Sequence, residues 1–288
     1  MDREKVAFVT GVSSGIGRAT ATALVDAGFR VFGTMRDPAG VGQALGRVEL
    51  IPMDVRDENS ASSAVKCVVD RAGRIDVLVN NAGIALIGSA EETSIEEAKQ
   101  LFETNFFGVL RLTQLILPIM RSQRSGRIVN ISSVVGFLPA PYMAVYGASK
   151  HAIEGYSESL DHELRQFGIR VSLIEPGFTR TGLAQNGQIS TQLVEAYSRE
   201  RGLALEAINH AISNGDDPAT VASVVVKALR GEPRLRYQAG SEAKMLDRLK
   251  KWAPSKLLDK GLRKQFGLPV KPEGHSLAAV RPYAAPQE

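Results

Sequence analysis

The fold class of this chain follows from one stretch near its start, Thr10-Gly11-Val12-Ser13-Ser14-Gly15-Ile16-Gly17. The apolar run 6–9 before it predicts a buried parallel strand, and the segment after it predicts an amphipathic helix that ends at residues 27–28. Glycines between a strand and a helix let the backbone approach a phosphate, and the helix N-terminus supplies free N–H groups. The stretch therefore predicts a dinucleotide site, although its spacing is G-x-x-x-G-x-G rather than G-x-G-x-x-G. A glycine-rich loop without a ligand is the alternative.

Strand and helix patterns alternate along the rest of the chain. Further strands are predicted at 30–35, 48–53, 76–80, 126–131 and 169–174, with an edge strand at 235–238. Such alternation predicts parallel βαβ units with right-handed crossovers. We therefore expect an α/β fold with a doubly wound, Rossmann-like parallel sheet in a single domain. Residues 1–240 would form the dinucleotide-binding catalytic domain, with an irregular lid over 178–215, and residues 241–288 a basic helical extension.

Residues 94–122 predict one long helix with apolar residues on more than one face, which Pro118 should kink or end. A helix of this kind covers a sheet and also a second subunit, so we expect a homodimer or homotetramer.

Composition excludes several classes of protein. The chain is 44% hydrophobic and 23% charged, as in an ordinary soluble globule. Its one cysteine, Cys67, cannot form an internal disulfide, and its four histidines lack ligand spacing, so we predict no metal. No stretch has the length of a membrane span and no secretion signal is present, so the expected location is the cytoplasm.

Charge is concentrated at the C-terminal end. From residue 230 onward the chain holds 13 Lys and Arg against 6 Asp and Glu, a net +7, whereas the preceding residues are net −3. The basic pI is thus a property of the tail and gives no reason to expect nucleic-acid binding. Leucines and basic residues interleave over 244–266 and predict one or two amphipathic helices. These would cover the substrate entrance, pack on another subunit or lie on an anionic membrane.

The end of the second strand concerns the choice of coenzyme. Arg36 follows this strand and, with Ser13, would bind a 2′-phosphate, which predicts NADP(H). Asp37 supports the alternative, NAD(H), as the acid that would hold the ribose hydroxyls. At the end of the third strand, Asp54 and Val55 are candidates for the adenine, the alternative for Asp54 being a helix cap.

A second motif is Tyr146-Gly147-Ala148-Ser149-Lys150, in which a tyrosine precedes a lysine by four residues on one helix face. A cation some 4 Å from the phenol is worth about 4 kcal/mol at an effective dielectric near 20, or about three pKa units. The pair therefore predicts a tyrosine that transfers protons near neutral pH. A solvated helix face is the alternative.

Together these motifs, with Asn81-Ala82-Gly83, Ser133 and Pro176-Gly177, resemble the short-chain dehydrogenase/reductase family over about residues 5–240. The basic strand end and the C-terminal extension resemble the branch that contains hydroxysteroid and retinol dehydrogenases. The resemblance implies that Tyr146 exchanges a proton with the substrate oxygen and that Lys150 binds the nicotinamide ribose and lowers the tyrosine pKa. It also implies that Ser133 hydrogen-bonds the substrate oxygen and that Asn105 holds a water in a proton relay behind Lys150. Cofactor contacts are implied at Gly11, Ser13, Ser14, Gly15, Ile16, Gly17, Arg36, Asp54, Val55, Asn81, Ala82, Gly83, Tyr146, Lys150, Pro176, Gly177 and Thr181.

The activity expected from these residues is hydride transfer between NADP(H) and a carbonyl or secondary alcohol on a largely apolar, steroid-like substrate. Pocket candidates, which as an alternative simply line the core, are Val134, Leu138, Met143, Phe178 and Leu183. Two other functions stay open: an NAD(H)-dependent retinoid or primary-alcohol dehydrogenase, and a non-catalytic protein that senses NADP.

Overall fold

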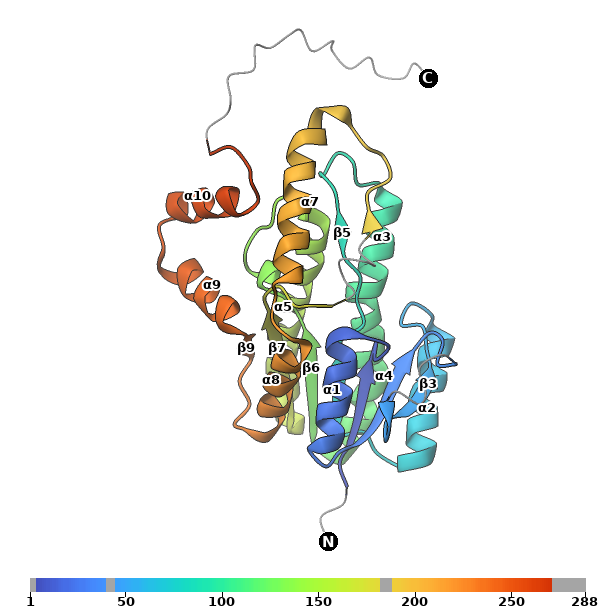
Figure 1. Cartoon of the computed structure of the whole chain (residues 1–288). Coiled ribbons are helices and arrows are strands. Elements are labelled where there is room, and N and C mark those ends of the chain that lie inside the picture. Colours follow the sequence, from blue (N-terminus) through green and yellow to red (C-terminus); the bar gives the residue numbers. More distant parts are fainter. Residues whose placement is uncertain (1–3, 40–44, 182–187, 271–288) are drawn as a thin grey trace.

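The computed structural model describes residues 4–39, 45–181 and 188–270, and its centre is a seven-stranded parallel sheet (Figure 1). The strands lie in the order β3-β2-β1-β4-β6-β7-β9, and every pairing between them is parallel. Their bounds are β1 Val6–Thr10, β2 Arg30–Met35, β3 Glu49–Pro52, β4 Val77–Asn80, β6 Gly126–Ile131, β7 Ile169–Pro176 and β9 Arg236–Ala239. The chain builds outward from β1 to β3 and then from β4 to β9, so β1 and β4 flank the point where the strand order reverses. The doubly wound fold in a single domain is therefore confirmed.

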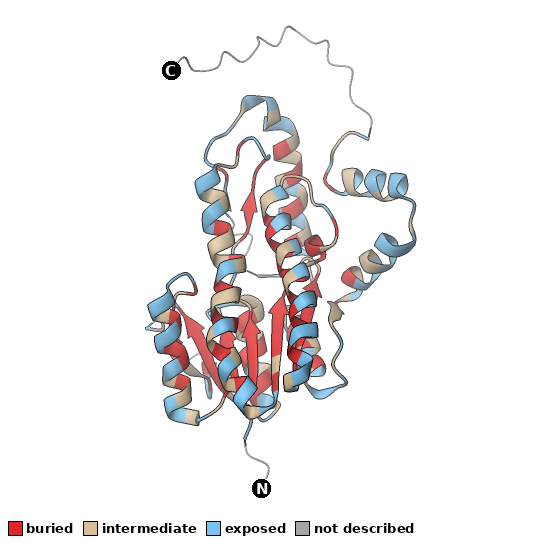
Figure 2. Cartoon of the chain, turned by 180° about the vertical axis from the view of Figure 1, so that it is seen from behind, coloured by how far each residue is buried: buried red, intermediate tan, exposed pale blue. Residues whose placement is uncertain are grey.

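Helices cover both faces of the sheet. Helices α1 (Gly15–Asp26) and α8 (Pro218–Arg230) pack on one face, in an apolar cluster with β1 and β2. On the other face, α2 (Glu58–Ala72), α4 (Gly108–Gln123) and α5 (Ala144–Leu164) form a second cluster with the same strands. Figure 2 shows the strands buried between these two layers. Strands buried on both faces account for the continuous apolar runs in the sequence.

Helix ends follow local sequence signals. Asp57 caps α2 by accepting from the Ser60 N–H, and Gly73 ends that helix in the left-handed conformation at φ +70°. The predicted start of α8 is confirmed, with Asp217 as N-cap accepting from the Ala219 N–H and Pro218 as the first residue.

The predicted helix over 94–122 is present, but it contains a π-helical turn and does not end at Pro118. The segment comprises α3 (Ile95–Phe102), a π-helical turn η2 (Glu103–Phe107) and α4. Pro118 lies inside α4, which continues to Gln123. Pro118 and Gln114, whose carbonyl loses its N–H partner, are both exposed, so water can satisfy that carbonyl.

The region after β7 is more regular than predicted. Its described residues contain β8 (Gln188–Ile189), the short turn η5 (Glu195–Tyr197) and the 16-residue helix α7 (Ser198–Ser213). Strand β8 pairs with β5 (Leu86–Ile87), and the buried Arg201 of α7 forms an ion pair with the buried Glu92. Residues 190–201 are thus tied to the segment that follows β5.

The C-terminal region confirms the expected edge strand and both amphipathic helices. Strand β9 pairs with β7, and α9 (Ser241–Trp252) and α10 (Ser255–Gln265) follow it. Two short 3₁₀ turns flank α5, η3 (Val134–Gly136) before it and η4 (Arg165–Phe167) after it. Within the described residues, none of the helices is both long and apolar enough to cross a membrane.

Candidate active site

The glycine-rich turn brings the start of α1 close to the strand ends. Gly11 and Gly15 have φ values of +70° and +54°, which favour glycine. A Cβ on Gly17 would overlap the Gly11 carbonyl oxygen and the Asn81 side chain. The Ser14 side chain caps none of the described N–H groups, and the first turn of α1 has no acidic residue. This turn, residues 11–17, is called the glycine cradle below. It has the properties of a phosphate site and fits the nicotinamide dinucleotide that the resemblance implies.

Asn81 joins the ends of the two central strands. Its Nδ2 donates to the carbonyls of Thr10 and Gly11, at 2.9 and 3.1 Å. The N–H groups of Asn81 and Ala82 both donate to the Thr10 hydroxyl at 2.9 Å. Asn81 thus holds the cradle in place, and the exposed Gly83 follows it at the same edge of the sheet.

The end of β2 presents an arginine to solvent. Met35 is buried, whereas Arg36 and Asp37 are exposed. The Asp37 carboxylate accepts from the Ala39 N–H at 2.9 Å, so it is engaged within its own turn. Arg36 is close enough to Asp54 for its charge to help lower the pKa of that carboxyl.

Asp54, which follows β3, does not cap a helix but binds a neighbouring arginine. Asp54 is held by the Arg56 guanidinium, at 2.7 Å in the closest contact, and these hydrogen bonds are the main reason why the pKa of Asp54 is lowered. The cap of α2 is Asp57, not Asp54. Val55 is buried, and its carbonyl accepts from Arg111 at 2.6 Å. A contact of Asp54 or Val55 with an adenine stays a prediction.

Ser133, Tyr146 and Lys150 meet at the carboxyl end of β6. The Ser133 side chain hydrogen-bonds that of Tyr146. The Lys150 Nζ lies 5.8 Å from the centre of the Tyr146 ring and donates to the Ile131 carbonyl at 3.0 Å. Tyr146 and Lys150 are both buried. The structure thus assembles a hydroxyl, a phenol and an ammonium where open α/β sheets bind ligands.

In the protein alone, the pKa of Tyr146 shifts upward, whereas the sequence predicted a downward shift. Burial raises the pKa of Tyr146 to about 12 and outweighs the hydrogen bond from Ser133, which lowers it. Burial also lowers the pKa of Lys150 to about 8, against the opposing charge of Glu154. Removing water from both groups disfavours phenolate and ammonium alike. The ammonium is also directed at a carbonyl of β6, so its stabilisation of the phenolate is weaker than the prediction assumed.

Asn105 lies in the π-helical turn η2 and contacts the active-site helix through Ser149. Its Nδ2 donates to the Ile84 carbonyl at 2.9 Å and to the Ser149 hydroxyl at 3.2 Å, and its Oδ1 accepts from the Ile84 N–H. Ser149 in turn donates to the Tyr146 carbonyl at 2.7 Å. Asn105 therefore fixes α5 beside Lys150, and a water held between them stays a prediction. Sequence reasoning missed Ser149, although it lies within the quoted motif.

A buried acidic pair behind Lys150 was also missed. Glu154, one helical turn after Lys150, shares Arg236 with Glu175, at 3.0 and 3.4 Å, and Gln238 donates to Glu175 at 2.7 Å. Burial raises the pKa of both carboxyls, that of Glu175 to about 7, and the charge of Glu154 raises it further. The position of Glu154, four residues after Lys150, could have indicated the first carboxyl of this pair from the sequence. The second, Glu175, lies on β7, and its place beside Glu154 follows only from the fold.

The raised pKa of Glu175 predicts that the protein becomes less stable as the pH rises above 4.5, the reverse of the effect of a carboxyl whose pKa is lowered. Its folded pKa lies above the usual 4.5, so the folded state holds a proton that the unfolded state has lost, and stability falls as the pH rises from 4.5 to about 7. Glu175→Gln, which keeps an acceptor for Gln238, is expected to remove much of this fall. Urea unfolding of both proteins at pH 5 and pH 8 measures it. Equal changes in both proteins would contradict the assignment.

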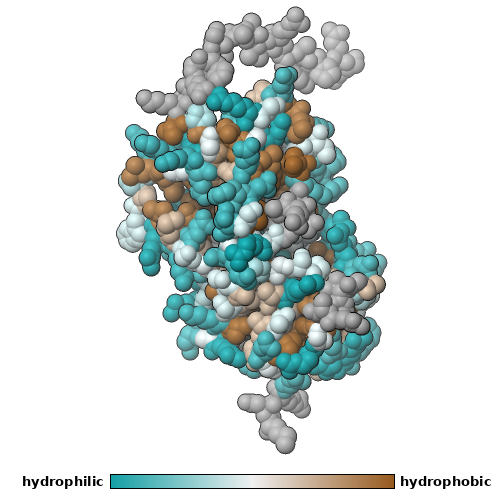
Figure 3. Space-filling model, viewed as in Figure 1, coloured by the Kyte–Doolittle hydropathy of each residue, from teal (hydrophilic) through white to brown (hydrophobic). Residues whose placement is uncertain are grey.

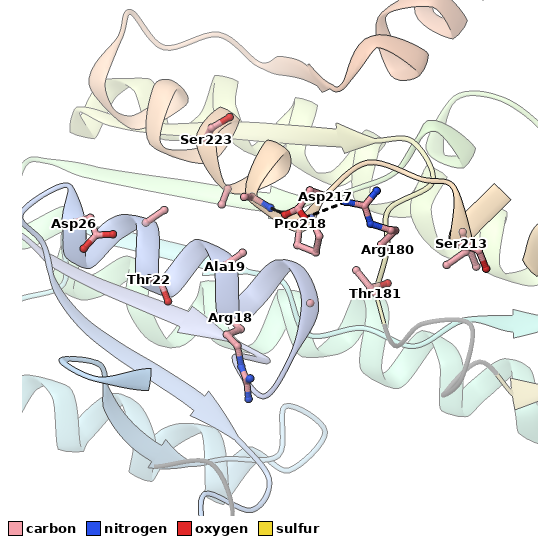
Figure 4. Close-up of a pocket in the computed structure, with 15 residues that line it drawn as sticks. Arg18, Ala19, Thr22, Asp26, Arg180, Thr181, Ser213, Asp217, Pro218 and Ser223 are labelled. Carbon is pink, nitrogen blue, oxygen red and sulfur yellow. Dashed lines mark hydrogen bonds and ion pairs between the residues drawn. The ribbon is translucent and has the colours of Figure 1, made fainter. Parts of the chain in front are cut away.

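The loop after β7 returns to the glycine cradle. A Cβ on Gly177 would lie 2.9 Å from Glu242, and one on Gly15 would lie 3.0 Å from the Thr181 methyl group. Figure 4 shows Thr181 at one end of a groove of about 920 Å³ between α1 and α8, near the ion pair of Arg180 with Asp217. Of the predicted site residues, Gly15 and Thr181 line this groove, and Tyr146 does not.

The predicted pocket residues fall into three groups. Val134, Met143 and Phe178 belong to the apolar cluster that contains Tyr146. Leu138 is buried but outside that cluster, and Leu183 lies outside the described residues. Helix α7 adds Ala204, Ile208 and Ile212 to the cluster, residues that the sequence prediction left in an irregular lid. In the residues that the structure describes, no cluster of His, Cys, Asp and Glu could hold a metal.

Comparison with known proteins places this geometry in a family. A family model described as short chain dehydrogenase matches residues 5–191. The chain is 37% identical over 263 residues to a 3-ketodihydrosphingosine reductase of Bacteroides thetaiotaomicron, covering 90% of this chain and 97% of that protein. It is 36% identical over 276 residues to retinol dehydrogenase 8 of Bos taurus, covering 88% and 87%. It is 35% identical over 269 residues to 17-beta-hydroxysteroid dehydrogenase type 1 of Mus musculus, covering 87% and 78%.

Solved structures of short-chain dehydrogenases have the same fold as this chain. A short-chain dehydrogenase from Streptomyces avermitilis superposes with a TM-score of 0.75 at 38% identity, covering 86% of this chain and 97% of the other. One from Burkholderia phymatum in complex with NAD gives 0.76 at 26% identity, covering 95% and 99%. The match over residues 5–191, with relatives more than 30% identical along most of their length, shows that this chain belongs to the short-chain dehydrogenase/reductase family of oxidoreductases.

Proposed function

We propose that this protein is an NADP(H)-dependent oxidoreductase that interconverts a carbonyl group and a secondary alcohol on a largely apolar substrate. The observation that carries the proposal is the meeting of Ser133, Tyr146 and Lys150 at the same carboxyl edge of the sheet as the glycine cradle, with Tyr146 inside an apolar cluster. Gly11, Gly15 and Gly17 would hold the coenzyme phosphates, and Asn81 and Lys150 would lie toward its nicotinamide end. When bound, the coenzyme supplies or accepts the hydride.

The protein residues handle the proton and the developing charge. In carbonyl reduction the oxygen becomes negative, and the Ser133 hydroxyl and Tyr146 phenol are donors that stabilise it. Burial keeps Tyr146 protonated at neutral pH, so the phenol is in the form that donates its proton to this oxygen. Lys150, with its pKa near 8, is still mostly protonated at pH 7 and offers its charge to the resulting phenolate. The reverse path oxidises the alcohol.

The apolar substrate class rests on two supports. The cluster around Tyr146 is formed by Val134, Met143, Phe178 and the inner face of α7. Several relatives are named for a sphingoid ketone, a retinoid or a steroid, all of which are hydrophobic. An apolar pocket with a few convergent polar groups is the usual form of such a site.

Activity is tested by following nicotinamide absorbance with a 17-ketosteroid, a long-chain aliphatic ketone and retinal, each with NADPH and NADH. We expect turnover of at least one apolar ketone and little turnover of acetone. Turnover of retinal alone, with NADH preferred, would favour the retinoid dehydrogenase alternative. No turnover in either direction, together with tight NADPH binding, would favour a non-catalytic sensor.

The coenzyme proposal rests on Arg36. This side chain is exposed at the end of β2, whereas Asp37 is engaged with Ala39, so a 2′-phosphate would meet a guanidinium there. Charge-assisted hydrogen bonds contribute about 1.5–3 kcal/mol, so Arg36→Ala should lower the NADPH/NADH ratio of kcat/KM by about 10- to 100-fold. Arg71→Ala, an exposed arginine of α2, is the control. An unchanged ratio in Arg36→Ala would refute the assignment, and a loss of NADH activity in Asp37→Ala would support NAD(H).

Three further expectations accompany this function: a homodimer or homotetramer, a cytoplasmic location, and a division into a catalytic domain over residues 1–240 and an extension over residues 241–288. The exposed Phe107 of η2 supports a subunit interface on this side of the molecule. Light scattering of the purified protein measures the mass directly.

A further inference from the structure

Helices α9 and α10 carry an unusual set of exposed apolar side chains. Nine large apolar side chains are exposed among the described residues, and five of them lie between 245 and 270: Met245, Leu249, Trp252, Leu257 and Val270. Trp252 is 84% exposed. Met245, Leu249 and Trp252 are spaced i, i+4 and i+7, so they form one stripe along α9. An exposed apolar stripe of this kind usually marks a surface that binds a partner or a membrane.

This stripe does not hold α9 on the protein. The opposite side of the helix does so, because Ala243 is fully buried and Leu246 packs against the cluster that contains Tyr146. Phe266 and Leu268, which follow α10, join the same cluster. Helix α9 is therefore anchored on one side and presents a separate apolar face on the other, while the residues that follow α10 anchor the end of that helix.

The segment that contains the two helices is also strongly basic. The described residues 241–270 contain eight Lys and Arg against three Asp and Glu, a net +5. On α10, the exposed Lys256, Lys260 and Lys264 are spaced i, i+4 and i+8 and form one row. In Figure 3, apolar and hydrophilic side chains alternate over the region of the surface that these helices occupy at the left of the view.

We propose that this face, formed by the Met245/Leu249/Trp252 stripe, Leu257 and the Lys256/Lys260/Lys264 row, binds the surface of an anionic lipid bilayer. Apolar side chains enter the boundary between headgroups and acyl chains, while the lysines meet the anionic headgroups. A second copy docked about a two-fold axis would set net +5 against net +5. A nucleic acid would neutralise the lysines but leave much of the stripe in water.

The position of the face links it to the proposed function. Ala243 and Leu246 of α9, and Phe266 directly after α10, belong to the cluster around Tyr146, so a bilayer on the outer side of α9 lies next to the proposed apolar pocket. Delivery of a substrate from lipid rests on the proposed function, whereas bilayer binding itself does not. The two can therefore fail separately.

The test is co-sedimentation of the full chain with vesicles of phosphatidylcholine alone and of phosphatidylcholine with about 30% phosphatidylserine, a composition chosen to give a net anionic surface. We expect binding to the anionic vesicles that weakens as salt is raised, and much weaker binding to the neutral ones. Trp252→Ala should weaken binding roughly tenfold, because the indole is an interfacial anchor. Lys256→Glu with Lys264→Glu should abolish the preference for anionic lipid.

Two control variants match these changes. Ile95→Ala removes an exposed apolar side chain on α3, and Lys66→Glu reverses an exposed charge on α2, and neither should change vesicle binding. Circular dichroism melting checks that each variant is folded. Equal binding to both vesicle types, or wild-type binding by Trp252→Ala, would overturn the proposal. A dimer abolished by Trp252→Ala would assign the face to a second copy, and salt-sensitive binding to a DNA duplex without binding to vesicles would assign it to nucleic acid.

Discussion

Tyr146→Phe is expected to lower kcat for ketone reduction by about 10²- to 10⁴-fold, the usual contribution of a positioned proton donor. The substitution keeps the buried ring and its packing and removes only the hydroxyl that Ser133 contacts. Because the apolar cluster around the ring is retained, KM should change much less than kcat.

The matched control is Tyr142→Phe. Tyr142 packs in the same apolar cluster and precedes the active-site helix, so loss of its hydroxyl tests for a general effect on the pocket. Steady-state kinetics with a ketone substrate and NADPH, with coenzyme binding measured separately, distinguishes the two variants. Undiminished kcat in Tyr146→Phe, or an equal loss in Tyr142→Phe, would show that Tyr146 is not the proton donor.

Asp161→Asn is expected to lower the free energy of unfolding by about 3 kcal/mol, the lower end of the range for breaking a buried ion pair. The Asp161 side chain, in α5, is only 1% exposed and accepts from Arg165, Arg170 and the Val171 N–H at 2.7 to 3.1 Å. Burial alone would raise its pKa, but these hydrogen bonds prevail and lower it to about 2. The lower end of the range applies because both arginines keep some contact with water.

The pH dependence gives this prediction a sign. Since the folded pKa of Asp161 lies below its usual 3.8, its contribution is present above pH 3.8 and is lost as the pH falls toward 2. The difference between wild type and Asp161→Asn should therefore shrink between about pH 4 and pH 2.5 in urea unfolding. Asp70→Asn breaks the exposed Lys66–Asp70 pair and should cost only about 0.5 kcal/mol. Equal losses in the two variants would mean that burial of Asp161 contributes nothing.

Much of the fold could be predicted because its signals are local. The strand at 6–10, the glycine turn and the Asp217–Pro218 helix start each depend on residues a few positions apart. Alternation of such units led to a doubly wound sheet, because parallel strands need a crossover between them. The sequence did not predict helix α7 because its buried face consists of Arg201, Ala204, Ile208 and Ile212, of which only the two isoleucines are large and apolar.

The sequence alone determined which chemical groups the site contains and roughly where on the chain they lie: the cradle glycines, Ser133, Tyr146 and Lys150. Tertiary packing determined their electrostatics. The pKa of Tyr146 is raised where the sequence predicted a lowered one, and that of Lys150 is lowered, because burial removes water from both groups. Glu154 and Glu175 form an acidic pair only because the fold places β7, with Glu175, and β9, with Arg236, beside Glu154. Desolvation and charge act through space, so they depend on which distant segments the fold brings together and not on spacing along the chain.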